Sequence, residues 1–132
     1  MRSPFEVLVL DDEDVVCERL ESHLEKKGCQ VETFTESQKA LDRLAEKTFD
    51  VVITDMKMEG PTGLDVLQFV RRQSPSTQVI IITGYGSIET IREAEYGGAF
   101  EFIHKPFTSS AIEALTMKAA TKARKHGSGD ER

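Results

Sequence analysis

Short β-branched apolar runs alternate with helix-length segments along the whole chain, and this rhythm limits the fold more than any other feature. The apolar runs lie at residues 6–10, 30–34, 50–54, 78–83 and 100–104. Apolar residues at spacings of three and four, typical of helices with one buried face, occupy residues 14–27, 36–47, 64–73, 88–96 and 110–124. A βα unit repeated in this way predicts an α/β fold with a doubly wound parallel sheet.

The apolar runs differ in how they should be buried. The first, third and fourth are almost entirely apolar, as in parallel strands covered on both faces, whereas QVETF at 30–34 alternates and is expected nearer an edge. Gly28 and Gly127 come directly after helical segments, where helix stops are common.

The chain length favours one hydrophobic core. A length of 132 residues suits a single domain, which we expect over residues 1–126. Residues 127–132, GSGDER, are polar and glycine-containing, so they form either a tail or the start of a linker into a further domain.

Composition excludes several classes of protein. A net charge of −6 disfavours direct nucleic-acid binding by this domain, because such binding needs clustered Lys and Arg. The apolar runs are too short to cross a membrane and the N-terminus lacks a signal pattern, so a soluble, cytoplasmic protein is expected. Cys17 and Cys29 lack the spacing of a zinc site or disulfide framework and are predicted to be buried thiols.

Polar residues gather at the ends of four predicted strands. Asp11 and Asp12 follow the first, Asp55 the third, Thr83 closes the fourth and Lys105 follows the fifth. The carboxyl ends of parallel strands share one edge, where ligands of such sheets bind. The sequence therefore predicts one site that contains all five residues.

Each residue has an ordinary structural explanation when taken alone. The acidic run at 11–14 could cap a helix, Asp55 could form a turn, and Lys105 could be an exposed residue before Pro106. Helix capping does not account for Asp55 or Lys105. Their joint placement favours a functional site.

The predicted cluster has the chemistry of a magnesium site that handles phosphate. Three carboxylates near one lysine repel one another by a few kcal/mol at intermediate dielectric. Mg²⁺ prefers carboxylate oxygens, water and phosphate oxygens, and the lack of nearby histidine or thiolate disfavours zinc. A remaining carboxylate can then attack phosphorus, with Lys105 and Thr83 as cation and donor.

Four motifs resemble a known family. The segments VLVLDDE, VVITDMKM, IIITGYGS and FIHKPF, in this order, closely resemble the receiver domains of bacterial two-component response regulators. The resemblance implies a flavodoxin-like sheet of five parallel strands in the order 2-1-3-4-5. It implies that Asp55 is the phosphoacceptor and that Asp12, Asp55 and the Lys57 backbone carbonyl bind Mg²⁺, with Asp11 acting mainly through water. Lys105 would pair with a phosphoryl oxygen.

The resemblance also implies a phosphorylation-activated switch rather than an enzyme, because such a domain catalyses only its own phosphoryl transfer and dephosphorylation. The Thr83 hydroxyl would move to the phosphoryl group and Phe102 would turn inward, although Phe102 could instead be an ordinary core residue. The output face would comprise the fourth strand, fourth helix and fifth strand.

Partners follow from the same resemblance. A sensor histidine kinase would supply the phosphoryl group. Residues 83–107 look most like receivers of sigma-54-dependent activators, in which an ATPase domain and a DNA-binding domain follow. The resemblance also allows a homodimer through the fourth helix, fifth strand and fifth helix, and the sequence leaves the oligomeric state open.

One residue departs from the family pattern. Glu59 stands four residues after Asp55, where family members commonly have Pro, so the shape of this loop is left open. Lys57 and Tyr85 are each two residues beyond a key position and are predicted to border the path of attacking water and to tune the phosphoryl lifetime.

Three other functions are compatible with this type of fold. An aspartate-nucleophile phosphatase would resemble Asp-x-Asp, but Met56 and Lys57 follow Asp55. A flavin or nucleotide binder would carry a glycine- or hydroxyl-rich loop in place of DDEDV at 11–15. A receiver-like module that dimerises without phosphorylation is the remaining alternative.

Overall fold

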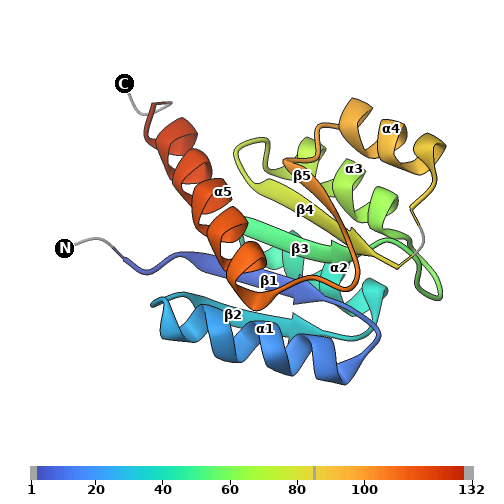
Figure 1. Cartoon of the computed structure of the whole chain (residues 1–132). Coiled ribbons are helices and arrows are strands. Elements are labelled where there is room, and N and C mark those ends of the chain that lie inside the picture. Colours follow the sequence, from blue (N-terminus) through green and yellow to red (C-terminus); the bar gives the residue numbers. More distant parts are fainter. Residues whose placement is uncertain (1–2, 85, 130–132) are drawn as a thin grey trace.

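The computed structural model describes residues 3–84 and 86–129, with side chains through Lys125 (Figure 1). Strands and helices alternate throughout, in the order β1 (Glu6–Leu10), α1 (Asp14–Lys26), β2 (Gln30–Phe34), α2 (Ser37–Glu46), β3 (Val51–Asp55), α3 (Gly63–Gln73), β4 (Gln78–Thr83), α4 (Ile88–Tyr96), β5 (Glu101–His104) and α5 (Ser109–Gly129). The five parallel strands have the order β2-β1-β3-β4-β5. The predicted fold class and strand order are confirmed.

The helices cover both faces of the sheet. Figure 1 shows α1 and α5 on one side and α2, α3 and α4 on the other. Val7 and Val9 pack with buried residues of α1 and α5, whereas Leu8 and Leu10 pack with buried residues of α2, α3 and α4. This division follows from the alternation of side chains along a strand.

The burial of the strands agrees with their composition. Every residue of β3 and β4 is buried, whereas β2 lies at an edge and is only half-buried. Two strands begin one residue later than predicted, at Val51 and Glu101, and Asp55 is the last residue of β3 rather than the residue after it.

Helix ends were predicted with mixed success. Helix α1 ends at Lys26, and Gly28 follows it as expected. The prediction that Gly127 stops the last helix was wrong, because α5 continues to Gly129. A glycine inside a helix costs only about 1 kcal/mol relative to alanine, so one glycine does not end a helix by itself.

The two cysteines are buried, as predicted. Burial raises the pKa of the Cys17 thiol to about 11 and also raises that of Cys29. Both thiols are therefore protonated and poorly reactive at neutral pH. In addition, none of the helices within residues 3–84 and 86–129 is long and apolar enough to cross a bilayer.

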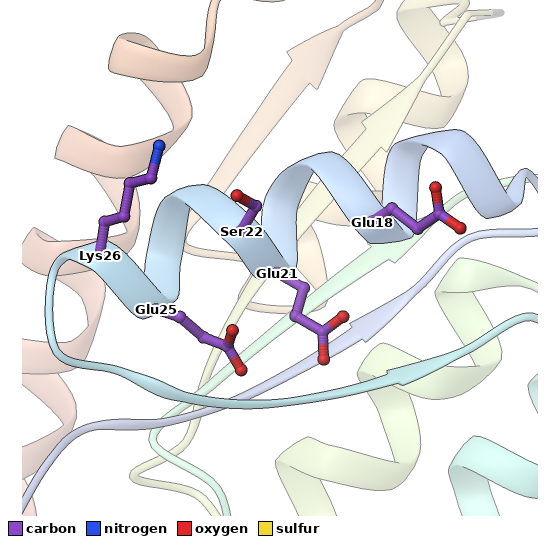
Figure 2. A pocket seen from close by; sticks show the side chains of 5 residues that line it. All are labelled: Glu18, Glu21, Ser22, Glu25 and Lys26. Atoms are coloured by element: carbon purple, nitrogen blue, oxygen red, sulfur yellow. The ribbon is translucent and has the colours of Figure 1, made fainter.

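The exposed face of α1 is acidic. A pocket of about 420 Å³ there is lined by Glu18, Glu21, Ser22, Glu25 and Lys26 (Figure 2). All of these residues come from one helix whose opposite face packs on the sheet. We therefore attribute this hollow to the spacing of solvated side chains on an amphipathic helix.

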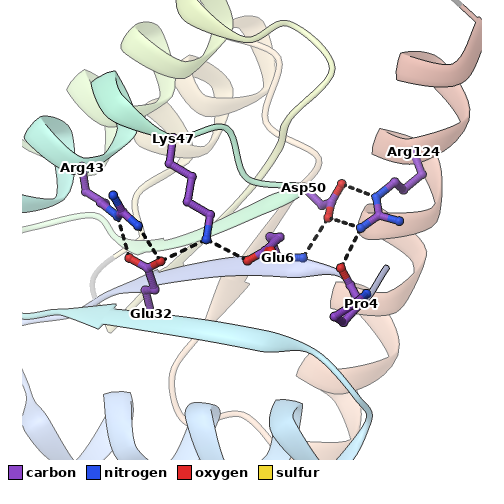
Figure 3. A network of polar contacts seen from close by, with 7 residues as sticks. All are labelled: Pro4, Glu6, Glu32, Arg43, Lys47, Asp50 and Arg124. Carbon is purple, nitrogen blue, oxygen red and sulfur yellow. Dashed lines mark hydrogen bonds and ion pairs between the residues drawn. The ribbon is translucent and has the colours of Figure 1, made fainter. Parts of the chain in front are cut away.

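A chain of ion pairs lies where β1 and β3 begin (Figure 3). Its members are Glu6, Glu32, Arg43, Lys47, Asp50 and Arg124. Arg124 of α5 donates to Asp50 Oδ1 from Nε at 2.9 Å and to Oδ2 from Nη2 at 3.1 Å, and it also donates to the Pro4 carbonyl at 2.7 Å. Asp50 in turn accepts from the Glu6 backbone N–H. These contacts tie the C-terminal half of α5 to the start of the sheet.

We expect the Arg124→Ala substitution to lower the free energy of unfolding by about 2 kcal/mol, because it removes a bidentate ion pair with the largely buried carboxylate of Asp50. The melting temperature should fall by several degrees, measured by circular dichroism. Lys125→Ala removes a positive charge from the neighbouring exposed position and should have little effect. Equal melting temperatures for the two variants would contradict a structural role for Arg124.

Candidate functional site

The parallel sheet brings the predicted polar residues to one edge. Asp11 directly follows β1 and Asp55 ends β3, and these two strands are hydrogen-bonded neighbours in the sheet. Ligand oxygens of Asp11, Asp12 and Asp55 lie within 4.8 Å of one another. Lys105, which follows β5, places its Nζ 2.9 Å from Asp11 Oδ2 and 3.5 Å from Asp55 Oδ2.

Asp11 is completely buried, which is unusual for a carboxylate. Its Oδ1 atom accepts a hydrogen bond from the Glu13 backbone N–H at 2.9 Å. Its Oδ2 atom has an ion pair with Lys105 but no partner of hydrogen-bonding geometry among the described residues. Burial raises the pKa of Asp11, and the contact with Lys105 offsets this only in part.

Asp55 is the last residue of β3 and the acidic residue of that strand, with 7% of its surface exposed. Its Oδ1 atom accepts from the Met56 backbone N–H at 2.8 Å, which leaves Oδ2 directed toward Lys105. Burial raises the pKa of Asp55, and the negative charge of Asp11 raises it further. The two buried carboxylates thus disfavour each other's ionised form.

Lys105 neutralises part of this charge. Burial disfavours its ammonium form, but the ion pair with Asp11 and the charge of Asp55 more than compensate, so the pKa of Lys105 is raised. Its backbone N–H donates to the carbonyl of Thr83 at 2.8 Å, which places the ends of β4 and β5 side by side. Thr83 itself is buried at the end of β4.

The cluster fits a hard divalent cation. It offers oxygen donors from three carboxylates, and one buried oxygen of Asp11 lacks a hydrogen bond within the described part of the chain. Because one lysine faces three acids, the site keeps an excess of negative charge. Mg²⁺ takes oxygen ligands of this kind and retains water, so the exposed position of Asp12 suits it as well.

The loop from Met56 to Thr62, here called the β3–α3 loop, borders the cluster. A pocket of about 400 Å³ beside it is lined by Asp12, Thr35, Glu36, Ser37, Gln38, Met58, Glu59, Gly60 and Pro61. Thr62 and Asp65 form a capping box that starts α3. The capping box therefore fixes the end of the loop, although Glu59 stands where the resembled family commonly has Pro.

Two features of this region, a capping box and a buried serine, were missed by sequence reasoning. The pattern Thr62-x-x-Asp65 is a capping-box signal, which would have placed the start of α3 at Gly63 rather than at residue 64. Ser37 is buried and donates to the Glu59 carbonyl at 3.1 Å. No local pattern indicates that contact, because its partners are 22 residues apart.

The remaining predicted residues lie near the cluster or outside the described region. Phe102 is partly buried against the core cluster that contains Ala94, and its ring centroid lies 5.5 Å from that of His104. Lys57 is exposed in the β3–α3 loop. Tyr85, predicted to border the path of water, lies outside the described residues.

Comparison with known proteins identifies the family pattern. Residues 7–117 match the model of the response regulator receiver domain. The chain is 34% identical over 112 residues to the response regulator protein PilR of Pseudomonas aeruginosa, covering 85% of this chain and 25% of that protein. It is 30% identical over 116 residues to the nitrogen assimilation regulatory protein NtrX of Azorhizobium caulinodans, covering 86% and 26%. The chain thus spans about a quarter of the length of these curated relatives.

Solved structures agree with these matches. A response regulator receiver domain protein from Clostridium thermocellum superimposes with a TM-score of 0.84 at 34% identity, covering 91% of this chain and 97% of that one. The beryllofluoride-activated NtrC4 receiver domain dimer gives a TM-score of 0.78 at 32% identity with the same coverage.

Proposed function

Because the chain belongs to the response regulator receiver domain family, we propose that its acidic cluster is the phosphorylation site of a signalling switch and that Asp55 accepts the phosphoryl group. One observation carries this proposal. Asp55 Oδ2 lies 3.5 Å from Lys105 Nζ and close to the carboxylates of Asp11 and Asp12. An anionic nucleophile beside a cation and a candidate metal site is what transfer to a carboxylate requires.

Phosphorylation and dephosphorylation of Asp55 need no reagent other than the phosphodonor and water. A carboxylate oxygen of Asp55 attacks phosphorus in a phosphohistidine or a small acyl phosphate, and a P–O bond forms. The bond from phosphorus to the leaving group breaks, and the leaving group keeps the electron pair. Water later attacks the aspartyl phosphate, which releases inorganic phosphate and restores the carboxylate.

The surrounding residues stabilise charge during this transfer. Mg²⁺, held by Asp12, Asp55 and the Lys57 backbone carbonyl, with Asp11 acting through water, would neutralise charge on the phosphoryl oxygens. Lys105, which already lies between Asp11 and Asp55, pairs with a phosphoryl oxygen. Lys57 borders the site and tunes the lifetime of the phosphoryl group.

The output is a change between two conformations. The Thr83 hydroxyl moves to the phosphoryl group, and Phe102 turns inward beside it. Two observations support this proposed switch. The Lys105 backbone N–H donates to the Thr83 carbonyl, so the ends of β4 and β5 are neighbours, and Phe102 is partly buried. New contacts worth a few kcal/mol suffice to invert such an equilibrium.

A receiver domain is a signalling module and not a metabolic enzyme, and we propose that this chain catalyses only its own phosphoryl transfer and dephosphorylation. A sensor histidine kinase is the proposed donor in the cytoplasm. Because the matched region covers only about a quarter of each relative, we propose that a C-terminal ATPase and DNA-binding output accompanies this domain. A homodimer through α4, β5 and α5 is proposed, in keeping with a relative whose receiver forms a dimer.

We expect the protein to gain one phosphoryl group when it is incubated with acetyl phosphate and Mg²⁺, measured by intact mass. Excess chelator should abolish the gain, because the cluster then keeps uncompensated negative charge that repels the phosphodonor. A full gain in chelator would contradict a metal-dependent site. If no gain occurs where a known receiver is labelled, the module works without phosphorylation.

A further inference from the structure

The β3–α3 loop is held at three places. At its start, the Met56 carbonyl accepts from the Gly63 backbone N–H at 2.9 Å. At its end, Thr62 and Asp65 cap α3. In the middle, the side chain of Ser37 in α2 contacts the loop, and its Oγ donates to the Glu59 carbonyl at 3.1 Å.

Ser37 is well placed to hold this loop. It is the first residue of α2 and only 2% exposed, so its hydroxyl is shielded from competing water. The hydroxyl does not cap its own helix, since the N-cap position is Glu36 and lacks a side-chain cap. Instead it reaches 22 residues along the chain to the loop.

The loop backbone also passes close to this serine. Gly60 adopts a φ of +80°, which side chains rarely tolerate, and a Cβ there would lie 3.6 Å from Ser37 Oγ. The turn at Gly60 thus directs the Glu59 carbonyl toward α2. Ser37 and Glu59 line the pocket of about 400 Å³ beside the β3–α3 loop, and Asp12 of the acidic cluster lines it as well.

From this geometry we propose that Ser37 is a positioning residue for the cation site. By fixing the Glu59 carbonyl, it fixes the path of the loop and with it the Lys57 carbonyl, two residues before Glu59. This inference rests on the proposed function, in which that carbonyl is a Mg²⁺ ligand.

Calorimetric titration of the intact chain with MgCl₂ tests the inference. Ser37→Ala should weaken Mg²⁺ binding about fivefold, the change expected from loss of one neutral hydrogen bond. Gln38→Ala is the matched control, because Gln38 is exposed on the same turn and its side-chain amide donates to Asp42 of its own helix. It should bind Mg²⁺ as the wild type does.

A second measurement separates positioning from general damage. The rate of labelling by acetyl phosphate should fall in Ser37→Ala at low Mg²⁺ and recover at saturating Mg²⁺, because only the affinity for the ion is changed. Gly60→Ala strains the same loop from its other side and should weaken Mg²⁺ binding in the same direction. If Ser37→Ala does not fold, the Mg²⁺ affinity of Gly60→Ala tests the inference instead.

The outcomes separate this inference from the proposed function. If Asp12→Asn binds Mg²⁺ as the wild type does, the cation site itself is wrongly placed and the proposed function fails. If Asp12→Asn binds weakly but Ser37→Ala and Gly60→Ala match Gln38→Ala, the cation site stands and the role of Ser37 is overturned.

Discussion

The Asp55→Asn variant is expected to gain no phosphoryl group from acetyl phosphate and Mg²⁺ under conditions that label the wild type fully. The amide is not a nucleophile for phosphorus, whereas the carboxylate is. The variant should stay folded, because asparagine has the same shape and its Oδ1 atom can still accept from the Met56 backbone N–H. Intact mass measures the gain, and circular dichroism measures the fold.

Asp42→Asn is the matched control for this experiment. Asp42 is exposed on α2, where it accepts a hydrogen bond from Gln38, and it belongs to no part of the cluster. The control should be labelled as the wild type is. Labelling of Asp55→Asn at the wild-type level would assign the nucleophile to another residue, with Asp12 the next to substitute because it is the exposed member of the cluster.

The Gly63→Ala variant should lose about 3 kcal/mol of stability, the largest effect of a single methyl group that we expect in this protein. A Cβ at Gly63 would lie 2.5 Å from the Asp55 carbonyl oxygen and 2.9 Å from Met56 Cα. Both are backbone atoms of β3 and the following residue, so neither can rotate away. Helix α3 would have to move off the sheet and stretch the hydrogen bond from Gly63 to the Met56 carbonyl.

Thermal unfolding followed by circular dichroism would show this loss as a fall in the melting temperature on the order of 10 °C. Gly84→Ala is the control, because a Cβ there meets nothing within 4 Å. A Gly63→Ala protein as stable as Gly84→Ala would mean that α3 has room to shift, and that its close approach to Asp55 does not constrain the site.

Local patterns in the sequence determined the helices and strands, and also the edge of the sheet at which the acidic cluster lies. The apolar runs and the three-and-four spacings reproduced every strand and helix to within one residue at most ends, because burial on one or both faces dictates those patterns. The parallel arrangement then placed Asp11, Asp55 and Lys105 at one edge without any knowledge of distances.

The tertiary structure alone decided how these residues meet. Complete burial of Asp11 and the ion pair of its Oδ2 atom with Lys105 depend on packing among three strands. The contact of Ser37 with Glu59 and that of Asp50 with Arg124 join residues 22 and 74 positions apart. Local propensity carries no information about such pairs, since they form only once the sheet has brought distant segments together.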